Sequence, residues 1–559
     1  MIREFDEHEV RLCKELSGCF LFRTSDDREY SIPVPGCWEQ NIDLINYRGK
    51  GSYYKDLYVS KDCNVRLYFK GVSHTADVYF DDTFITHHYN AYTGFEAVIC
   101  NVSKGHHHLR VDVDNSFSEA SALHKPNDYE TFGGIIRPLV FEELSDVYVK
   151  SMHFEPRFED GIWSGTTSLT IKNLSASDKK VCVSLSLAST SLAKADKSLD
   201  ITINANSQEK VSFDIEYPDI LPWSSQTPNL YYLKAEVTND SGNLIDDLID
   251  RVGFRTISIN GNDILLNNEK LFLKGFNRHE DFGTLGNAVP YQIMVSDLDM
   301  VKDLGGNAIR TCHYPNDERF LDLCDERGIL VWEENHARGL SLGDMCNPNF
   351  DRQCKDCIDE MIDQHFNHPS IFIWGILNEC ASDTEVGRNK YKLQYDQIKK
   401  LDTSRPRTSA TCKHFSDICL DIPEVVSINI YTGWYEDADD KERFEREKEW
   451  LDTTQGAGKP LIISEFGAAA VYGFRDMGHS KWSEERQADI ICSNLDVYYN
   501  DPRVSGVFLW QFADCKVTEK DWFYTRARTH NNKGIVDEYR RPKLSYQTVK
   551  EYFHKERNL

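Results

Sequence analysis

The ten residues from Ile371 to Cys380 read "IFIWGILNEC", an apolar run that leads directly into Asn378 and Glu379. A short continuous apolar run of this kind is typical of a fully buried strand. A buried strand has no structural need of a carboxylate at its tip. In a barrel of parallel strands, however, the C-terminal strand ends build the catalytic face. Glu379 is therefore either a capping or solvated side chain, or a catalyst.

The same pattern recurs through residues 259–559, where short apolar runs alternate with longer amphipathic stretches. The predicted strands lie within residues 270–277, 307–315, 329–335, 371–379, 407–413, 425–431, 460–467 and 505–514. Eight strand–helix units in about 300 residues predict a TIM (β/α)8 barrel. A doubly wound sheet would place a Gly-rich turn after its first strand, and "GFNRHEDFG" (275–283) is not that fingerprint.

The residues before the barrel are predicted to form two β domains, at 1–146 and 147–258. Alternating apolar and polar residues with Asp-Asp turn signals mark the first. Short alternating strands such as "KVCVSLSLA" (180–188) mark the second as a sandwich. A chain of 559 residues is long enough for three domains.

Composition excludes several classes of function. The chain has 64 Lys and Arg against 90 Asp and Glu, a formal charge of −26, which argues against a nucleic-acid partner. No apolar stretch is long enough to span a membrane. The N-terminus lacks the apolar segment of a secretory signal, so we expect a cytoplasmic protein with free thiols among its 16 cysteines. The only CxxC pair, Cys354 and Cys357, has no second pair nearby, so metal binding is not expected there.

Polar residues gather at six of the eight predicted strand ends, including Glu379 after the fourth strand and Glu465 at the end of the seventh. Two such carboxylates suit glycoside hydrolysis, in which one protonates the leaving oxygen and the other attacks the anomeric carbon. Each has a structural alternative. Glu379 could be a loop carboxylate paired to Arg, and Glu465 could be a first-turn residue favoured by a helix dipole.

Six motifs resemble glycoside hydrolase family 2 in their order and spacing. They are "GFNRHEDF", "NAIRTCHYP", "WGILNE", "SINIYTGWY", "IISEFG" and "LWQFAD". "YTGFEAVI" (92–99) is similar to the jelly roll of that family, and "LPWSSQTPNLYYLKAEV" (221–237) to the end of its immunoglobulin-like domain. The resemblance implies a jelly roll, an immunoglobulin-like sandwich and a TIM barrel in that order, assembled into a homotetramer or dimer.

Within the family the sequence looks most like the bacterial β-glucuronidases. The segment "THNNKGIVDEYRRPK" (529–543) resembles their motif in which an Asn and a Lys grip the carboxylate of the sugar. The matching residues here are Asn531 and Lys533. An ammonium and an amide donor give a uronic acid charge-assisted hydrogen bonds. The alternative is a turn Asn and a solvated Lys.

The resemblance also implies a role for each site residue. Glu379 matches the general acid/base, Glu465 the nucleophile and Asn378 the donor to the 2-hydroxyl. The remaining matches are Tyr431 beside the nucleophile, Tyr435 near the carboxylate, His279 and Trp510 lining the sugar pocket, Asp128 on the sugar hydroxyls, and His313 in support. His279, His313 and Trp510 could instead be core residues, and Asp128 a loop cap. Retention predicts carboxyl groups about 5–5.5 Å apart. We expect no cofactor and no metal.

Some residues depart from the β-glucuronidase pattern. Thr432 replaces a second aromatic, and Ala527, flanked by Arg526 and Arg528, stands where an arginine is expected. The resemblance predicts a retaining exo-β-glucuronidase that removes terminal β-D-glucuronic acid from glucuronides or oligosaccharides by double displacement, and these differences leave a β-galacturonidase or a dual β-hexuronidase open. The segment after the third strand, residues 336–353, is short, which predicts an open aglycone side that admits oligosaccharide ends. Two further hypotheses are a neutral-sugar β-galactosidase or β-mannosidase and a non-catalytic carbohydrate-binding protein.

Overall fold

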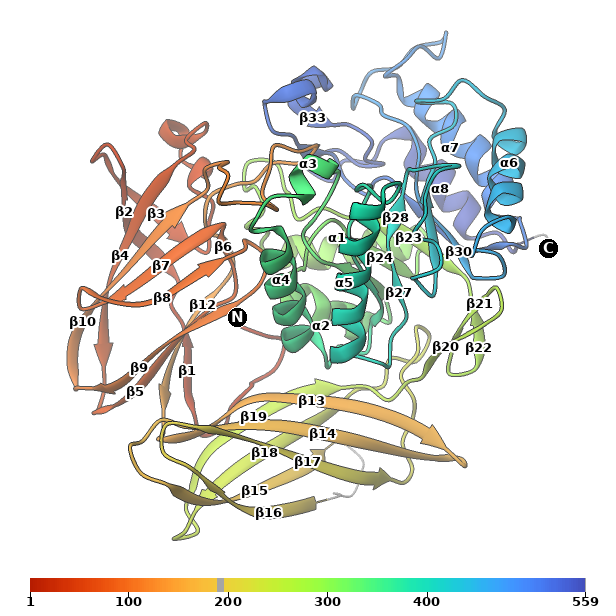
Figure 1. Cartoon of the computed structure of the whole chain (residues 1–559). Coiled ribbons are helices and arrows are strands. Elements are labelled where there is room, and N and C mark those ends of the chain that lie inside the picture. The colour runs from red at the N-terminus through yellow and green to blue at the C-terminus, as the bar shows by residue number, and fades with distance from the viewer. Residues whose placement is uncertain (189–195, 558–559) are drawn as a thin grey trace.

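The computed structural model describes residues 1–188 and 196–557 and has a parallel barrel beside two antiparallel β regions (Figure 1). The barrel strands are β23 (Leu273–Asn277), β24 (Ala308–Thr311), β25 (Leu330–Glu334), β26 (Ile371–Gly375), β27 (Arg407–Thr408), β28 (Ala410–Thr411), β29 (Val426–Asn429), β30 (Leu461–Phe466) and β31 (Val504–Leu509). They pair in the order β27-β26-β25-β24-β23-β31-β30-β29-β28, always in parallel. β27 and β28 are separated only by Ser409, so the sheet closes into the predicted barrel.

Helices alternate with these strands along the chain. They are α1 (Tyr291–Asp303), α2 (Glu318–Arg327), α3 (Leu342–Met345), α4 (Phe350–His365), α5 (Glu385–Leu401), α6 (Asp440–Asp452), α7 (Glu484–Tyr498) and α8 (Leu544–Phe553). Local chemistry sets their limits. At α2, the Asp317 side chain accepts a hydrogen bond from the backbone N–H of Arg319, and Gly328 ends the helix in the left-handed conformation.

The first β region is a jelly roll of two facing antiparallel sheets. One sheet has the order β1-β12-β5-β9 and the other β3-β2-β4-β10-β7-β8. The strands are β1 (Leu12–Glu15), β2 (Gly18–Thr24), β3 (Glu29–Val34), β4 (Lys50–Val59), β5 (Cys63–Phe69), β7 (Thr75–Phe80), β8 (Thr83–Tyr89), β9 (Phe95–Val102), β10 (Gly105–Asp114) and β12 (Leu139–Leu144), with a small pair β6 (Val72–Ser73) and β11 (Gly134–Ile135). Their alternating apolar residues form one core between the sheets.

The second β region is a seven-stranded sandwich. A three-stranded sheet, β13-β14-β17, faces a four-stranded sheet, β16-β15-β18-β19. The strands are β13 (Val147–Glu159), β14 (Ile162–Asn173), β15 (Lys179–Ala188), β16 (Asp196–Ile203), β17 (Gln208–Tyr217), β18 (Tyr231–Asn239) and β19 (Leu244–Val252). The sandwich has its own apolar core, so the predicted fold class is confirmed. The exact domain boundaries stay a prediction.

A short antiparallel sheet precedes the barrel: β20 (Ile257–Asn260), β21 (Asp263–Leu266) and β22 (Glu269–Leu271). Ile264 and Leu266 of β21 share an apolar cluster with Leu273, Ala308 and Leu330, which are the first residues of their barrel strands. The interior at the N-terminal strand ends is therefore filled with apolar side chains. Polar side chains are left for the opposite, C-terminal face.

Strand β26 ends at Gly375, earlier than the sequence pattern predicts. Beyond it, Leu377 and Glu379 have positive φ angles of 43° and 54°. Neighbouring backbone holds this conformation. The N–H of Asn378 donates to the carbonyl of Ala337, and the N–H of Glu379 donates to that of Ala410, at 3.1 and 2.9 Å. The acidic side chain is thus set by a bend that the third and fifth strand ends support.

The cysteines behave as the composition predicts. All 16 are free thiols. Cys354 and Cys357 are buried on the inner side of α4, in the main barrel core. Within the described residues, no helix combines the length and the apolar character that crossing a membrane requires.

Gly375, at the end of β26, has no room for an added methyl group. A Cβ there would lie 2.3 Å from Trp332 Nε1 and 2.7 Å from Glu334 Cβ, both buried. We expect Gly375→Ala to lower the free energy of unfolding by about 1–3 kcal/mol, through overpacking. The measurement is urea unfolding. Gly343→Ala, whose Cβ meets only Ser341 Oγ at 3.6 Å, is the control. Equal stability of the two variants would contradict this packing argument.

Candidate active site

Two carboxylates meet at the C-terminal face of the barrel. Glu465 lies within β30 and its side chain is 3% exposed, whereas that of Glu379 is 17% exposed. Glu465 accepts hydrogen bonds from Arg310 Nη1 at 2.9 Å and from the Tyr431 hydroxyl at 2.7 Å. Glu379 accepts one from Asn429 Nδ2 at 2.9 Å. Glu465 is the more buried of the two carboxylates, and Glu379 has more contact with solvent.

The electrostatics of the pair are asymmetric. Burial, and then the negative charge of Glu379, raise the pKa of Glu465 to about 7, while Arg310 and the Tyr431 hydroxyl oppose the rise. The surroundings of Glu465 therefore disfavour its charged form more than Arg310 and Tyr431 favour it.

Arg310 of β24 connects several strand ends. Its guanidinium donates to both oxygens of Glu334 at 3.0 Å each, and to Asn378 Oδ1 at 2.8 Å. It also donates to Asn277 Oδ1 at 3.1 Å and reaches Glu465. The Arg310 side chain is fully buried. Arg310 thus contacts Glu465 directly and also holds Asn378, the residue before Glu379.

The predicted pocket residues His279 and Trp510 lie together with His313, for which a supporting role is predicted. The Trp510 ring stacks on that of His313, with centroids 5.1 Å apart, and meets that of His279 edge-on at 5.4 Å. His313 Nδ1 contacts Glu334 Oε1 at 2.7 Å, and His279 Nδ1 contacts the Tyr314 hydroxyl at 3.1 Å. Among the described residues, Nε2 of each ring has no hydrogen-bond partner. Burial lowers the pKa of both histidines well below the usual value, so both are neutral.

Asn531 and Lys533 are brought to the same face by the hairpin of β32 (Cys515–Lys516) and β33 (His530–Asn531). Lys533 is buried, and its ammonium donates to Asn531 Oδ1 at 3.3 Å. It also lies 5.3 Å from the centre of the Tyr435 ring, which belongs to a 56% exposed residue. Asn531 Nδ2 donates to Asp128 Oδ2 at 3.0 Å. The jelly roll thus reaches the barrel site through Asp128.

Arg526, the residue before Ala527, brings a guanidinium to this part of the site. Its guanidinium donates to both oxygens of Asp128, at 2.9 and 2.5 Å, and its central carbon lies 5.1 Å from the centre of the Trp522 ring. Arg528, the other flanking arginine, pairs with Glu538 instead. Of the two arginines that flank Ala527, Arg526 is thus the one that contacts Asp128.

Sequence reasoning also missed Arg338 and Asn429 as members of the site. Arg338 Nη2 lies 3.4 Å from Glu379 Oε2, and its Nη1 donates to Asn127 Oδ1 at 2.9 Å. Asn429 Nδ2 reaches both Glu379 and, at 3.2 Å, Asn378 Oδ1. The available signal was a polar residue inside or just after an otherwise apolar run, in "VVSINIY" and "HARGL".

Comparisons with known proteins agree with this architecture. Residues 257–558 match the family model "Glycosyl hydrolases family 2, TIM barrel domain", and residues 147–255 match "Glycosyl hydrolases family 2". The solved β-galacturonidase of Eisenbergiella tayi, bound to galacturonate, is 48% identical over 100% of both chains, with a TM-score of 0.96. The solved β-D-glucuronidase of Dictyoglomus thermophilum is 26% identical over 99% of both chains, with a TM-score of 0.86.

Among curated sequences, the β-glucuronidase of Paenibacillus borealis is 24% identical, over 97% of this chain and 96% of its own length. That of Streptococcus agalactiae is 26% identical, over 91% and 90%. The family model alone covers more than half of the chain. With the barrel, the two β domains and the paired carboxylates in place, the chain belongs to glycosyl hydrolase family 2 and is a glycoside hydrolase.

Proposed function

We propose that the protein is a retaining exo-β-hexuronidase that removes a terminal β-linked galacturonic acid, with glucuronic acid as the second candidate. The observation that carries the proposal is the buried cation Lys533 beside Asn531, with Arg526 next to them. In a chain of charge −26, cations grouped in one pocket are matched to an anionic ligand. A neutral galactoside or mannoside gives a buried ammonium no partner of opposite charge.

The mechanism follows from the different surroundings of the two carboxylates. Glu465, fixed by Arg310 and Tyr431, attacks the anomeric carbon and forms a covalent glycosyl-enzyme. Glu379 protonates the departing glycosidic oxygen, and its partial exposure gives it access to the aglycone and then to water. In the second step Glu379 takes a proton from that water as the water oxygen attacks the anomeric carbon, and the ester bond to Glu465 breaks to release the sugar and the free carboxylate. A carboxyl separation of about 5–5.5 Å, which retention requires, stays a prediction.

The remaining predicted residues bind and orient the sugar. The free Nε2 atoms of His279 and His313 accept hydrogen bonds from sugar hydroxyls, and Trp510 forms an apolar wall between them. Asn378, held through its Oδ1 by Arg310, has an unpartnered Nδ2 among the described residues and donates it to the 2-hydroxyl. Tyr435 covers Lys533, and Asp128 accepts from a hydroxyl near the carboxylate end.

The choice of galacturonate over glucuronate rests on similarity. The relative that is 48% identical is a β-galacturonidase solved with galacturonate, whereas the β-glucuronidases above are 24–26% identical. The two sugars differ only in the orientation of the 4-hydroxyl. The replacements at Thr432 and Ala527 are consistent with a different set of contacts to that group. The predicted cytoplasmic location and homo-oligomer stay predictions.

The deciding experiment compares hydrolysis of the p-nitrophenyl β-galacturonide, β-glucuronide and β-galactoside, with Glu465→Gln as the inactive control. Galacturonide turnover well above glucuronide turnover, lost in Glu465→Gln, is the expected result. Preference for the glucuronide would leave the proposed mechanism unchanged and make glucuronate, not galacturonate, the preferred sugar. Turnover of the galactoside alone would overturn the assignment of Lys533.

The short segment after β25 contains only the one-turn helix α3 before α4 begins. This supports a proposed aglycone side that admits the ends of oligosaccharides. Release of uronic acid from a β-linked terminal disaccharide or trisaccharide is the expected outcome. An enzyme that cleaves the aryl uronides well but releases nothing from any such oligosaccharide would contradict this proposal.

Lys533→Ala should lower kcat/KM for the preferred uronide roughly 30-fold to several thousand-fold, because the substrate anion loses a buried partner. This corresponds to a rise of about 2–5 kcal/mol in the activation free energy. Turnover of the neutral β-galactoside, if measurable, should change little. Lys516→Ala, in the neighbouring strand β32, is the matched control and should retain full activity. A loss of less than threefold in Lys533→Ala would remove Lys533 from the substrate site.

The pH profile should report the raised pKa of Glu465. Its attacking form is the carboxylate, so kcat/KM should fall as pH drops through about 7.

Glu379→Gln removes the charge that raises the pKa of Glu465, so the acid limb of the pH profile should move to lower pH. Tyr431→Phe removes a hydrogen bond that lowers it, so the limb should move to higher pH. An activated aryl uronide, which needs little acid assistance, makes both variants measurable. Shifts of the opposite sign would contradict the assignment of nucleophile.

A further inference from the structure

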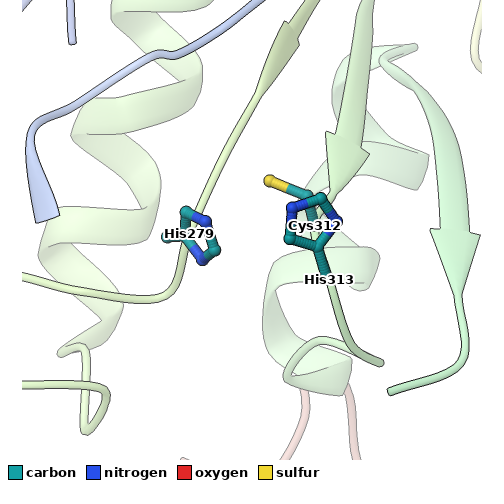
Figure 2. A group of neighbouring side chains, drawn as sticks. All are labelled: His279, Cys312 and His313. Atoms are coloured by element: carbon teal, nitrogen blue, oxygen red, sulfur yellow. The ribbon is translucent and has the colours of Figure 1, made fainter. Parts of the chain in front are cut away.

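Three donor atoms from two strand ends converge beside the nucleophile. Figure 2 shows the sulfur of Cys312 between the rings of His279 and His313. One ligand atom from each residue lies within 4.8 Å of the others, and all three residues are buried. His279 follows β23, and Cys312 and His313 follow β24, so no short sequence motif announces the group.

The surroundings leave the imidazoles ready to accept an ion. The Nδ1 atoms already contact Glu334 and the Tyr314 hydroxyl, so the Nε2 atom of each ring is the nitrogen left for a ligand. A carboxylate on the far nitrogen of His313 is the arrangement that commonly orients a metal-ligating histidine. Both Nε2 atoms are buried and, among the described residues, without a hydrogen-bond partner. The set therefore provides two free nitrogen donors and one thiol.

The local charge does not exclude a cation. Arg310 has its Nη2 atom 3.3 Å from His313 Nδ1. It is matched by two carboxylates, Glu334 and Glu465, to both of which it donates. Glu465 Oε1 also lies 4.0 Å from His313 Nε2, on the side of the free lone pair. A fourth oxygen ligand is thus within reach of a small side-chain adjustment.

We propose that His279, Cys312 and His313 bind a soft divalent metal ion of the zinc class, and that the bound ion inhibits the enzyme. Two imidazoles, one thiolate and a carboxylate are a tetrahedral zinc donor set, whereas Mg²⁺ and Ca²⁺ prefer oxygen ligands. Cys312 ligates as the thiolate, and its proton is released to solvent. The ion takes the two Nε2 lone pairs and the Glu465 oxygen, so sugar and metal exclude each other. This competition, unlike metal binding itself, rests on the proposed placement of the sugar.

Metal binding is measured first without substrate, by calorimetric titration of ZnCl2 into the full chain freed of any polyhistidine tag. We expect one ion per chain, proton release, and no comparable binding of Mg²⁺. Cys312→Ser should weaken zinc binding by at least about tenfold, since even the loss of a supporting partner costs a metal site that much. Cys412→Ser is the matched control, because Cys412 is a more exposed thiol near Glu379 and should not affect binding.

A second measurement does not depend on any variant folding. Co²⁺ added to the unmutated chain should give a thiolate-to-cobalt charge-transfer band. Galacturonate or glucuronate should displace the ion and so remove this band. Absence of that band, or zinc binding lost in Cys412→Ser but kept in a folded Cys312→Ser, would overturn the proposal. Zinc binding that leaves uronide turnover unchanged would overturn its inhibitory part. Because binding is read without turnover, these failures are distinct from a failure of the proposed hexuronidase activity.

Discussion

The site depends on one buried guanidinium. Arg310 donates to Glu334, Glu465, Asn277 and Asn378, and so ties together the ends of β23, β24, β25 and β30 and the bend that follows β26. A buried ion pair of this kind adds little net stability, because removing the charges from water offsets much of their attraction. Its contribution is positional and electrostatic. It holds Glu465 and Asn378, the residue before Glu379, in one frame, and it limits how far burial can raise the pKa of Glu465.

The carboxylate end of the proposed sugar site follows a different electrostatic rule. Arg526 and Asp128 are already paired there, and Lys533 and Asn531 lie against them. The cations Lys533 and Arg526 outnumber the single carboxylate of Asp128, which keeps the pocket positive by one charge. That excess is what a uronate would neutralise. Because Asp128 comes from the jelly roll, the N-terminal region is part of the proposed substrate site rather than an attachment to the barrel.

The barrel and its catalytic face were predictable from the sequence, because a parallel barrel requires buried apolar runs at regular intervals and places polar residues at their ends. The sequence did not predict which side chains from different loops and strands come together. The guanidinium of Arg526 reaches the site although Ala527 holds the expected sequence position, because the segment before β33 is irregular. His279 and Cys312 come together from different strands, which spacing along the chain does not reveal. Arg338 lies in a loop whose path only the structure gives.

The conformation after β26 explains why an apolar strand leads into a carboxylate. Gly375 has no room for a side chain between Trp332 and Glu334, so the strand can pass close to the third strand before it ends. The chain then places two non-glycine residues, Leu377 and Glu379, in left-handed conformations, each at a cost on the order of 1–3 kcal/mol. A loop with a merely structural task could avoid this cost by using glycine. The bonds to Ala337 and Ala410 instead hold the costly conformation, which presents Glu379 to Asn429 and Arg338. Strain retained at this position is consistent with selection for where the carboxylate points.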